Sequence, residues 1–576
     1  MEDYRVRYQQ WLEDPFIDEE TKAELRSIAA DETEIKERFF KELEFGTGGL
    51  RGIIGNGSNR LNQYTVGKAS QGLANYILKE GTQDKGVAIA YDSRFMSPEF
   101  AEVAGLIFAA NGIPAFVYPS LRPVPMLSFA VRELGCTAGV VLTASHNPPE
   151  YNGYKVYWAD GAQVVAPRDK GIITEVNAVT DFGQIKRMDR AEAEAKKLFN
   201  LIGEEVDEAF DKNVQASLMN HEMIQRMGDK LNIVYTPLHG SGNMPVRRNL
   251  EKAGFKNVYI VKEQEAPDSS FSTVDYPNPE DTKVFVMAQE LAAKVDADIL
   301  IGTDPDCDRV GVMAKDEKGE FVALTGNHVG ALATEYILSQ RKEQGRLPEN
   351  GAVIKTIVST EMITPICEAY GVEKMDVLTG FKFIGEKIKG FEETGSHTYL
   401  YGFEESYGCL GGTYARDKDA VFASVLVCEM AAYYKEKGMT LYEALLSLYE
   451  KYGYFREGVK SLTMKGLEGM ERIQLIMKTF RENTPAALGG FKVVVAKDYK
   501  TQVFKNLVTG EESGSPLPVS DVLHYTLEDG TWVCIRPSGT EPKLKFYIGV
   551  KADSLQAAQD KVDVLDKDID AKIAAI

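Results

Sequence analysis

Three aspartates stand at alternating positions directly after a short apolar run of the sequence. Asp304, Asp306 and Asp308 are close enough to repel one another unless a cation neutralises them, and carboxylate oxygens suit Mg²⁺. An EF-hand calcium loop would need glycine at its sixth position and glutamate at its twelfth, where this sequence has Arg309 and Lys315. The spacing therefore favours a magnesium site, with a solvated acidic turn as the alternative.

A serine lies on a segment that cannot continue as a strand. VVLTASHNPP (140–149) leads an apolar strand end into Ser145 and His146 and is then stopped by Pro148 and Pro149. Proline cannot donate to a β-ladder and fits poorly inside a helix. Open α/β sheets place their ligands at the carboxyl ends of strands. We therefore interpret Ser145 as a side chain held on a stiff loop at such an end; a plain polar turn is the alternative.

Three further loops have residue types that bind phosphate or sugar hydroxyls. FGTGGLRG (45–52) offers unobstructed N–H groups beside an arginine, but no Gly-Lys-Ser/Thr follows, so it is not a Walker loop. RPSGTEPK (536–543) is either a tight turn or a cradle in which a guanidinium, two hydroxyls and N–H donors hold a phosphate dianion. GFEESYG (402–408) holds sugar hydroxyls or merely caps a helix. The candidate residues are Arg51, Glu404, Ser406, Arg536, Ser538, Gly539 and Thr540.

Alternating strand and helix patterns predict the elements that position these loops. From Gly86, apolar strands alternate with helical stretches near 97–111 and 125–134, and the pattern restarts near 231 and near 351. Such alternation is typical of mainly parallel α/β sheets. From about 456 strands follow one another and a helix starts at Ser554, which predicts an α+β domain. The first 44 residues have apolar positions at helical spacing, so we expect two or three helices there.

These patterns predict four domains, each with one of the loops. N-terminal helices and a first α/β domain would span 1–205 and carry the serine, and a second α/β domain would span 206–320 and carry the aspartates. A third α/β domain over 321–455 would carry the sugar-binding loop, and an α+β domain over 456–576 the phosphate cradle. A chain of this length exceeds what a single core supports.

Composition is that of an ordinary globular protein and limits the classes of partner. Of 576 residues, 44% are hydrophobic and 26% charged. The net charge of −20 opposes generic binding of nucleic acid or anionic membranes, so an anionic substrate needs a locally basic pocket. We find no CxxC pair, secretory signal or apolar run of ~18 residues. We expect a cytoplasmic monomer or homodimer that binds small molecules, neither nucleic acid nor membrane.

Six segments in a fixed order resemble one enzyme family. They are TASHNPPEYNGYK, DPDCDR, TGFKFIG, GFEES, RDKDA and RPSGTEPK. Together they resemble the α-D-phosphohexomutase superfamily, and the long N-terminal region with EFGTGGLRG looks most like its bacterial phosphoglucomutase branch. The resemblance covers nearly the whole chain. It implies three consecutive α/β mixed-sheet domains plus a C-terminal α+β domain around a central active-site cleft, with the fourth domain moving on a hinge.

The resemblance also implies a reaction, the interconversion of α-D-glucose 1-phosphate and glucose 6-phosphate. Ser145 would pass its phosphoryl group to the sugar, and the resulting glucose 1,6-bisphosphate would turn around and return its other phosphate. This bisphosphate is then both intermediate and activator. Mg²⁺ would bind Asp304, Asp306, Asp308 and a phosphoserine oxygen, where it offsets charge on the transferring group.

Roles for the basic and polar residues follow from the same resemblance. Lys155 is the candidate acid/base, with His146 and Arg309 nearby. The residues expected to contact substrate are Arg51, Arg94, Lys382, Glu404, Ser406, Lys418, Arg536, Ser538, Gly539 and Thr540. Some relatives have a histidine just after the sugar loop that can act in proton transfer, where this chain has Gly408. We therefore assign proton transfer to Lys155 and Lys418.

Alternatives to this reading remain. Mannose phosphates, or pentose 1- and 5-phosphates, would keep the mechanism and change the sugar, since one stereocentre is worth only ~1–3 kcal/mol. Water reaching phosphoserine 145 would make the protein a phosphatase, which closure of the cleft opposes. A phosphosugar-binding scaffold without catalysis is disfavoured because Ser145, Lys155 and the three aspartates are intact.

Overall fold

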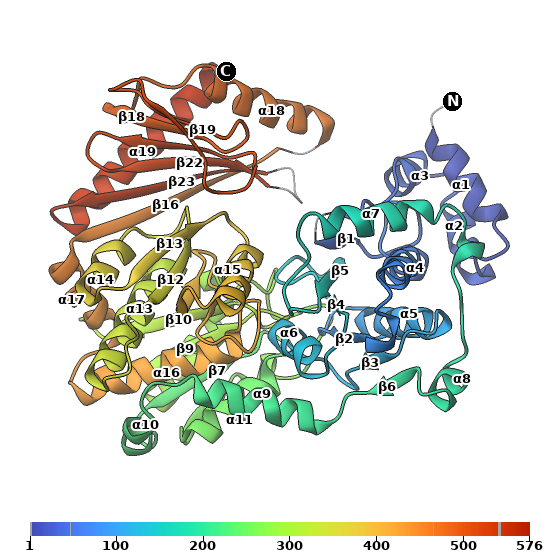
Figure 1. Ribbon diagram of the computed structural model, residues 1–576, viewed down its shortest axis with the longest axis horizontal. Coiled ribbons are helices and arrows are strands. Elements are labelled where there is room, and N and C mark those ends of the chain that lie inside the picture. The colour runs from blue at the N-terminus through green and yellow to red at the C-terminus, as the bar shows by residue number, and fades with distance from the viewer. Residues whose placement is uncertain (1–2, 47, 465, 539–542) are drawn as a thin grey trace. The chain divides into compact units, whose positions relative to one another are not determined.

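The computed structural model describes residues 3–46, 48–464, 466–538 and 543–576, which form two compact units (Figure 1). Unit 1 comprises Met1–Ala323, Ile384–Tyr399 and Ser406–Thr440. Unit 2 comprises Leu324–Phe383, Leu400–Glu405 and Leu441–Ile576. The chain therefore crosses between units several times inside the predicted third domain. The boundaries of the four predicted domains stay predictions.

Three helices open unit 1, as the apolar spacing predicts: α1 (Asp3–Glu13), α2 (Glu19–Ser27) and α3 (Glu32–Phe39). The side chains of Asp18 and Asp31 accept hydrogen bonds from the first turns of α2 and α3, which satisfies N–H groups that a helix leaves free. Trp11 on α1 meets the rings of Phe39, Tyr64 and Phe182 edge to face. The helices are therefore packed on the body of unit 1 by an aromatic cluster.

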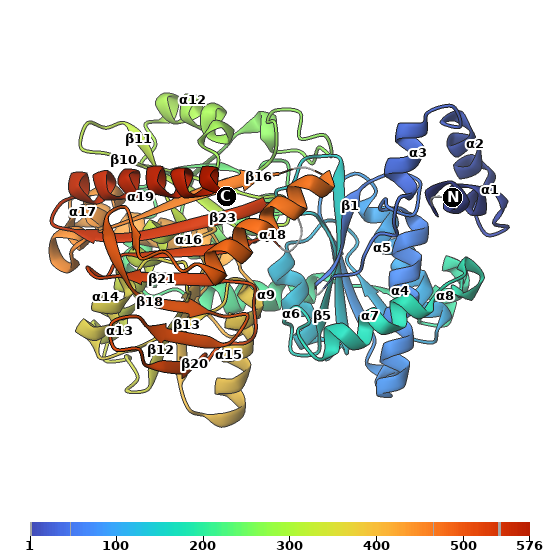
Figure 2. The ribbon, with the colours of Figure 1, turned by 90° about the horizontal axis from the view of Figure 1, so that it is seen from above.

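The first sheet of unit 1 has six strands in the order β1-β5-β4-β2-β3-β6. They are β1 (Gly49–Ile53), β2 (Val87–Tyr91), β3 (Ala115–Val117), β4 (Ala138–Leu142), β5 (Tyr151–Trp158) and β6 (Phe199–Leu201). Strands β4, β2, β3 and β6 are parallel. At the β4 edge, β5 pairs antiparallel with β4, and β1 pairs antiparallel with β5. Figure 2 shows α4 (Gln63–Glu80) and α5 (Ser97–Ala110) on one side of this sheet and α6 (Val124–Glu133) on the other. The two predicted helices after Gly86 are thereby confirmed.

The segment 45–52, interpreted from the sequence as a loop, is a strand in its second half. Gly49–Ile53 forms β1, in which Arg51 stands opposite Gly153 of β5. Gly49 has φ +131°, and a Cβ there would come within 1.8 Å of the carbonyl oxygen of Tyr154. Glycine is required here because two backbones approach closely.

The second sheet of unit 1 has five strands in the order β11-β10-β9-β7-β8. They are β7 (Asn232–Thr236), β8 (Asn257–Ile260), β9 (Ile299–Thr303), β10 (Val310–Lys315) and β11 (Phe321–Leu324). β9 is parallel to β7 and antiparallel to β10, so the aspartate segment is the turn between β9 and β10. The helix α16 (Ala420–Glu436) packs against β9 and α11 (Asn243–Ala253). The segment before α16 therefore lies in the same unit as the aspartates.

Unit 2 contains an α/β part and the C-terminal α+β part. β12 (Gly351–Thr356) and β13 (Glu373–Val377) pair in parallel, and β14 (Thr398–Phe403) borders β12. The C-terminal sheet runs β16-β23-β22-β21-β18-β19-β20, with its described pairs antiparallel. Its strands are β16 (Tyr454–Thr463), β18 (Phe491–Asp498), β19 (Val503–Asn506), β20 (Glu512–Gly514), β21 (Leu523–Leu527), β22 (Trp532–Pro537) and β23 (Lys543–Ala552), and β17 (Ala487–Leu488) pairs with β18.

Two helices, α18 (Gly466–Glu482) and α19 (Leu555–Ala575), share a buried apolar core with this sheet. The side chain of Ser554 caps α19, which confirms the helix predicted to start at this serine. The expected fold, α/β domains with mixed sheets followed by an α+β domain, is confirmed.

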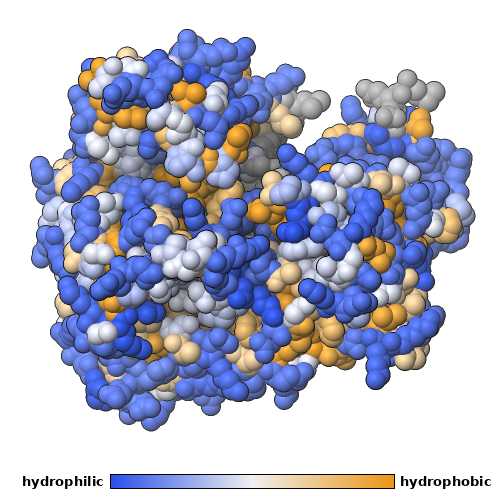
Figure 3. All heavy atoms as spheres, viewed as in Figure 1, coloured by the Kyte–Doolittle hydropathy of each residue, from blue (hydrophilic) through white to orange (hydrophobic). Residues whose placement is uncertain are grey.

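The surface is polar and the thiols are inside. On the face drawn in Figure 3, hydrophilic residues dominate and hydrophobic ones lie scattered among them. All six cysteines are buried, and none forms a disulfide. Within the described ranges, no helix combines the length and the hydropathy that a membrane crossing needs.

Candidate active site

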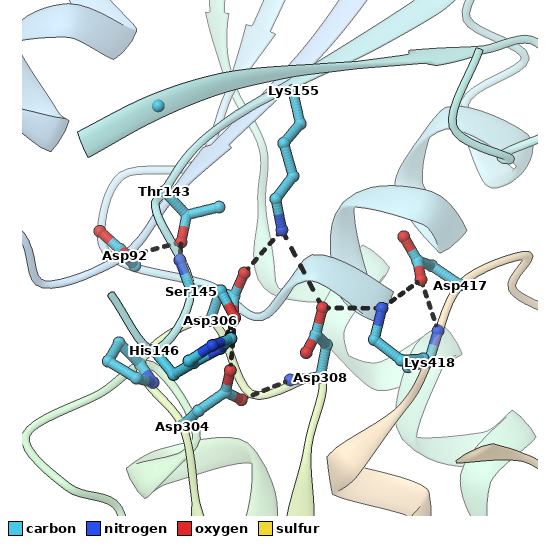
Figure 4. A network of polar contacts seen from close by, with 12 residues as sticks. Asp92, Thr143, Ser145, His146, Lys155, Asp304, Asp306, Asp308, Asp417 and Lys418 are labelled. Carbon is cyan, nitrogen blue, oxygen red and sulfur yellow. Dashed lines mark hydrogen bonds and ion pairs between the residues drawn. The ribbon is translucent and has the colours of Figure 1, made fainter. Parts of the chain in front are cut away.

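The serine loop begins where β4 ends and is fixed by a chain of hydrogen bonds (Figure 4). The hydroxyl of Thr143 donates to Asp92 Oδ2 at 2.6 Å and accepts the backbone N–H of Ser145 at 2.8 Å. Ser145 has φ +53°, in the left-handed region that costs energy for a residue other than glycine. The buried pair of Asp92 and Thr143 supports this conformation, so the hydroxyl of Ser145 is held in place.

The guanidinium of Arg94 donates hydrogen bonds to backbone carbonyls of the same loop. It is 1% exposed and donates to the carbonyls of Ser145 at 2.6 Å and of Pro148 and Tyr151 at 2.8 Å each. It also bonds the carbonyl of Asn147 and lies 3.4 Å from Asp92 Oδ2. One planar, always charged group thus ties together both ends of the loop. Substrate contact by Arg94 stays a prediction, since its guanidinium hydrogen bonds described here go to the loop.

The three aspartates are buried together beside the serine. Asp304, Asp306 and Asp308 are at most 2% exposed, and one carboxylate oxygen of each lies within 4.8 Å of the others. The hydroxyl of Ser145 donates to Asp304 Oδ2 at 2.7 Å. The N–H groups of Asp308 and Arg309 both donate to Asp304 Oδ1 at 3.0 Å, which closes the turn. The nucleophile candidate and the candidate metal site therefore belong to one cluster.

The chemistry of the donor set fits a divalent cation. Oδ1 of Asp306 and of Asp308 is buried and has no hydrogen-bond partner in the described part of the chain. Burial, together with the charges of Asp306 and Asp308, raises the pKa of Asp304 well above its usual value; burial and the charge of Asp306 raise that of Asp308. Burial also opposes ionisation of Asp306, but the charge of Lys155, the hydrogen bonds with Asp304 and Lys155, and the charge of Lys418 together lower the pKa of this carboxyl. A cation bound by one oxygen of each aspartate would neutralise the repulsion between the carboxylates. It could also provide a partner for Oδ1 of Asp306 and of Asp308.

Two lysines flank the aspartates. Lys155, on β5, donates to Asp306 Oδ2 at 2.9 Å and lies 4.0 Å from Asp308. Lys418 lies 3.1 Å from Asp308 Oδ2 and 3.2 Å from Asp417 Oδ1. These cations give the cluster the locally positive rim that an anionic substrate needs in a chain of negative net charge.

Several residues that hold this cluster were not singled out from the sequence. Asp417 fixes Lys418 and accepts a hydrogen bond from the buried Tyr157 at 2.6 Å. Asp92 and Thr143 fix the serine loop. Asp92 stands two positions before the candidate Arg94, and Asp417 stands within RDKDA, so both could have been found near residues already singled out. Tyr157 is indistinguishable in sequence from an ordinary core tyrosine.

His146 and Arg309 lie at the edge of the cluster. The hydroxyl of Ser145 is 3.2 Å from Nδ1 of His146. Burial, followed by the positive charges of Arg309 and Arg51, lowers the pKa of His146 well below its usual value, so the imidazole is neutral at pH 7. Arg309 pairs with Glu280 and lies 3.8 Å from Asp308 Oδ1. Both residues are therefore near the serine and aspartates, as expected.

The predicted sugar- and phosphate-binding residues divide between the units. Arg51, Arg94, Ser406 and Lys418 belong to unit 1, and Lys382, Glu404, Arg536 and Ser538 belong to unit 2. In unit 2, Glu404 Oε1 accepts the backbone N–H of Gly380 at 2.8 Å, which joins the GFEES and TGFKFIG segments. The N–H of Ser538 donates to the carbonyl of Lys543 at 2.8 Å. Gly539 and Thr540 lie outside the described residues.

This arrangement is suited to phosphoryl transfer. A hydroxyl held beside an oxygen-only cation site and between cationic side chains is placed to accept and release a phosphoryl group. Such a reaction needs positioning and charge stabilisation more than covalent chemistry from the protein. The site therefore supports a phosphotransfer enzyme.

Comparison with known proteins points the same way. Four phosphoglucomutase/phosphomannomutase family models match in order: alpha/beta/alpha domains I, II and III over residues 42–182, 209–319 and 325–452, and the C-terminal domain over 485–567. Phosphoglucomutase from Staphylococcus haemolyticus is 36% identical over 91% of this chain and 93% of its own. Phosphoglucomutase from Staphylococcus aureus strain MRSA252 is 36% identical over 92% and 94%.

Solved structures share the fold. Parafusin (phosphoglucomutase) from Paramecium, in its open form, superimposes with a TM-score of 0.66 at 17% identity, covering 92% of this chain and 94% of its own. A phosphoglucomutase/phosphomannomutase family protein from Burkholderia thailandensis gives 0.62 at 18% identity, covering 91% and 97%. At these identities the match concerns the fold alone.

Proposed function

The chain belongs to the phosphoglucomutase/phosphomannomutase family, and we propose that it is a phosphoglucomutase that interconverts α-D-glucose 1-phosphate and glucose 6-phosphate. Relatives named phosphoglucomutase match over about nine-tenths of the chain, which supports an enzyme of this activity. The observation that carries the proposal is the hydrogen bond from Ser145 to Asp304 within the buried aspartate cluster.

The proposed reaction begins with a phosphoryl group on Ser145. A hydroxyl oxygen of the sugar monophosphate attacks the phosphorus, the bond from phosphorus to Ser145 Oγ breaks, and glucose 1,6-bisphosphate forms. The intermediate turns around, and the same steps run in reverse with its other phosphate. The proton of the attacking hydroxyl passes to a basic group, for which Lys155 is our candidate and Lys418 the alternative.

The remaining assignments rest partly on contacts within the chain and partly on the resemblance to the family. Asp304, Asp306 and Asp308 would hold Mg²⁺, which when bound supplies charge neutralisation for the transferring group. Arg94 keeps the serine loop rigid through its bonds to the loop carbonyls. The residues proposed to hold the sugar and its non-reacting phosphate are Arg51, Lys382, Glu404, Ser406, Arg536, Ser538, Gly539 and Thr540.

We further propose that the enzyme acts in the cytoplasm, as a monomer or homodimer, on small sugar phosphates. The absence of a membrane-crossing helix among the described residues and the charge of −20 agree with this setting. Glucose 1,6-bisphosphate would serve as the activator that restores phosphoserine 145.

A ³¹P NMR substrate panel tests the proposal. Purified protein with Mg²⁺ and a trace of glucose 1,6-bisphosphate is given glucose 1-phosphate, mannose 1-phosphate or ribose 1-phosphate in separate tubes. Preferential conversion of the glucose ester is the expected result. Faster conversion of the mannose or ribose ester would change the sugar and keep the mechanism. Inorganic phosphate as the main product, or no conversion, would overturn the mutase.

A further inference from the structure

Unit 2 contains a cavity of about 470 Å³ to which the proposed reaction assigns no role. One wall is the face of the C-terminal sheet formed by β18, β19, β21 and β22, and the opposite wall contains Glu361 and Asp376. No residue that we assign to sugar or phosphate binding lines it. The volume is within the range of small-molecule sites.

The sheet wall combines aromatic rings with two nitrogen-bearing side chains. Phe504, Lys497 and His524 stand opposite one another on β19, β18 and β21, so they share one face of the sheet. The ring of Trp532 stacks on His524 with centroids 5.5 Å apart, and the Lys497 ammonium lies 5.7 Å from the Phe504 centroid. Aromatic rings and a cation therefore line the same side of the cavity.

The carboxylates of the opposite wall already have cationic partners. Lys355, fully buried, lies 2.8 Å from Glu361 and 3.0 Å from Asp376. Lys374 lies 2.8 Å from Asp376 and 3.5 Å from Glu361. Two lysines thus pair with the two carboxylates, and Lys497 forms no ion pair with either of them.

The side chains of Lys497 and His524 have no hydrogen bond or ion pair within the described ranges of the chain. His524 is 7% exposed, and its Nδ1 is buried without a partner. Burial, followed by the charge of Lys497, lowers its pKa to about 3, so the imidazole is neutral and carries one N–H. Burial also lowers the pKa of Lys497. A buried polar side chain without a partner is uncommon in a finished fold and indicates a missing ligand or water.

We propose that this cavity binds a small organic anion with a flat apolar body, of the class of aromatic monocarboxylates. The ring would pack against Trp532 and Phe504. The carboxylate would pair with Lys497 and accept the N–H of His524, which supplies both with the partner they lack. This ligand is distinct from the sugar phosphates, whose proposed binding residues lie elsewhere.

Fluorine NMR of protein labelled with 5-fluorotryptophan tests the proposal. The chain has three tryptophans, so each resonance is assigned with one Trp→Phe variant. The probes are benzoate, benzylamine and benzyl alcohol, which have one ring and differ in charge. Benzoate should shift the Trp532 resonance saturably, and the other two should not do so at the same concentration.

Variants locate the anion partner. Lys497→Met should weaken benzoate binding about tenfold or more, equivalent to about 1.4 kcal/mol, whereas Lys497→Arg should largely keep it. The matched control is Lys505→Met, since Lys505 lies on β19, is half exposed and pairs with Glu512. Retained mutase activity verifies folding. The proposal fails if benzoate leaves the Trp532 resonance unmoved, if benzylamine binds as well, or if Lys497→Met binds benzoate unchanged.

Discussion

The hydroxyl of Ser145 donates a hydrogen bond to Asp304 across 159 positions of sequence. The two residues follow the ends of β4 and β9, strands of two different sheets in unit 1, and each sits in a turn held by further hydrogen bonds. The geometry therefore places the proposed phosphoryl acceptor directly beside the candidate cation site. Four outcomes follow from this arrangement and from the buried charges of the fold.

Removing one metal-ligand candidate should abolish turnover without unfolding the protein. Asp306→Asn is expected to lower kcat/KM by at least ~10³-fold, about 4 kcal/mol of transition-state stabilisation. The matched control is Asp296→Asn, since Asp296 is 92% exposed and pairs only with Lys315 among the described residues. Chelation of divalent ions should abolish the activity of the unaltered enzyme, and added Mg²⁺ should restore this activity. Full activity of Asp306→Asn after chelation would contradict the assignment.

Replacing Arg94 should loosen the serine loop. Arg94→Met leaves Asp92 buried without its counter-charge and frees the loop carbonyls, so we expect a loss of about 3–5 kcal/mol in the free energy of unfolding. Arg94→Lys restores charge but not the planar fork, so kcat should stay well below that of the parent. Urea denaturation and steady-state kinetics measure both effects. Arg226→Lys, at an exposed pair with Glu436, is the control and should change neither.

Two substitutions of Lys155 separate charge from proton transfer. Lys155→Arg keeps a cation beside Asp306 but cannot give up its proton near neutral pH, so kcat should fall by ~10²–10⁴-fold, as in Lys155→Met. Lys418→Arg should lose much less, because its proposed part is the ion pair with Asp308. If Lys418→Arg is the more damaged variant in kcat and in its pH–rate profile, the proton passes through Lys418 instead.

Acid should destabilise the C-terminal sheet through His524. Its pKa is about 3 in the folded state and ~6.5 in an unfolded chain. The unfolded state therefore binds the extra proton between these values, and stability falls as pH drops from 6.5 towards 3, by about 1.4 kcal/mol per pH unit. His524→Phe, which keeps the stack on Trp532, should flatten this slope by one proton. Urea denaturation at several pH values measures it. An unchanged slope in His524→Phe, or a slope changed equally by His221→Gln at an exposed histidine, would contradict the cause.

Much of the fold and of the site could be predicted from sequence because the signals were local. The spacing of the three aspartates predicts a metal site, and the place of Ser554 before an apolar helical pattern predicts a helix start. Non-local relations could not be predicted in this way. Lys418 belongs to the predicted third domain, far along the chain from Asp308. Its segment precedes α16, which packs on β9, and the lysine thereby reaches Asp308. The hydrogen bonds from the Arg94 guanidinium to the loop carbonyls of residues 145–151 could not be predicted from the sequence near Arg94.

The most direct test of the account is whether Ser145 carries the phosphoryl group through the reaction. The enzyme is incubated with ³²P-labelled glucose 1,6-bisphosphate and Mg²⁺, freed of sugar, and then mixed with unlabelled glucose 1-phosphate. Label should appear on the peptide containing Ser145 and leave it within one turnover, passing through glucose 1,6-bisphosphate into glucose 6-phosphate. Ser145→Ala should take up none. Label that stays on the peptide, appears as inorganic phosphate, or is taken up equally by Ser145→Ala would contradict the account.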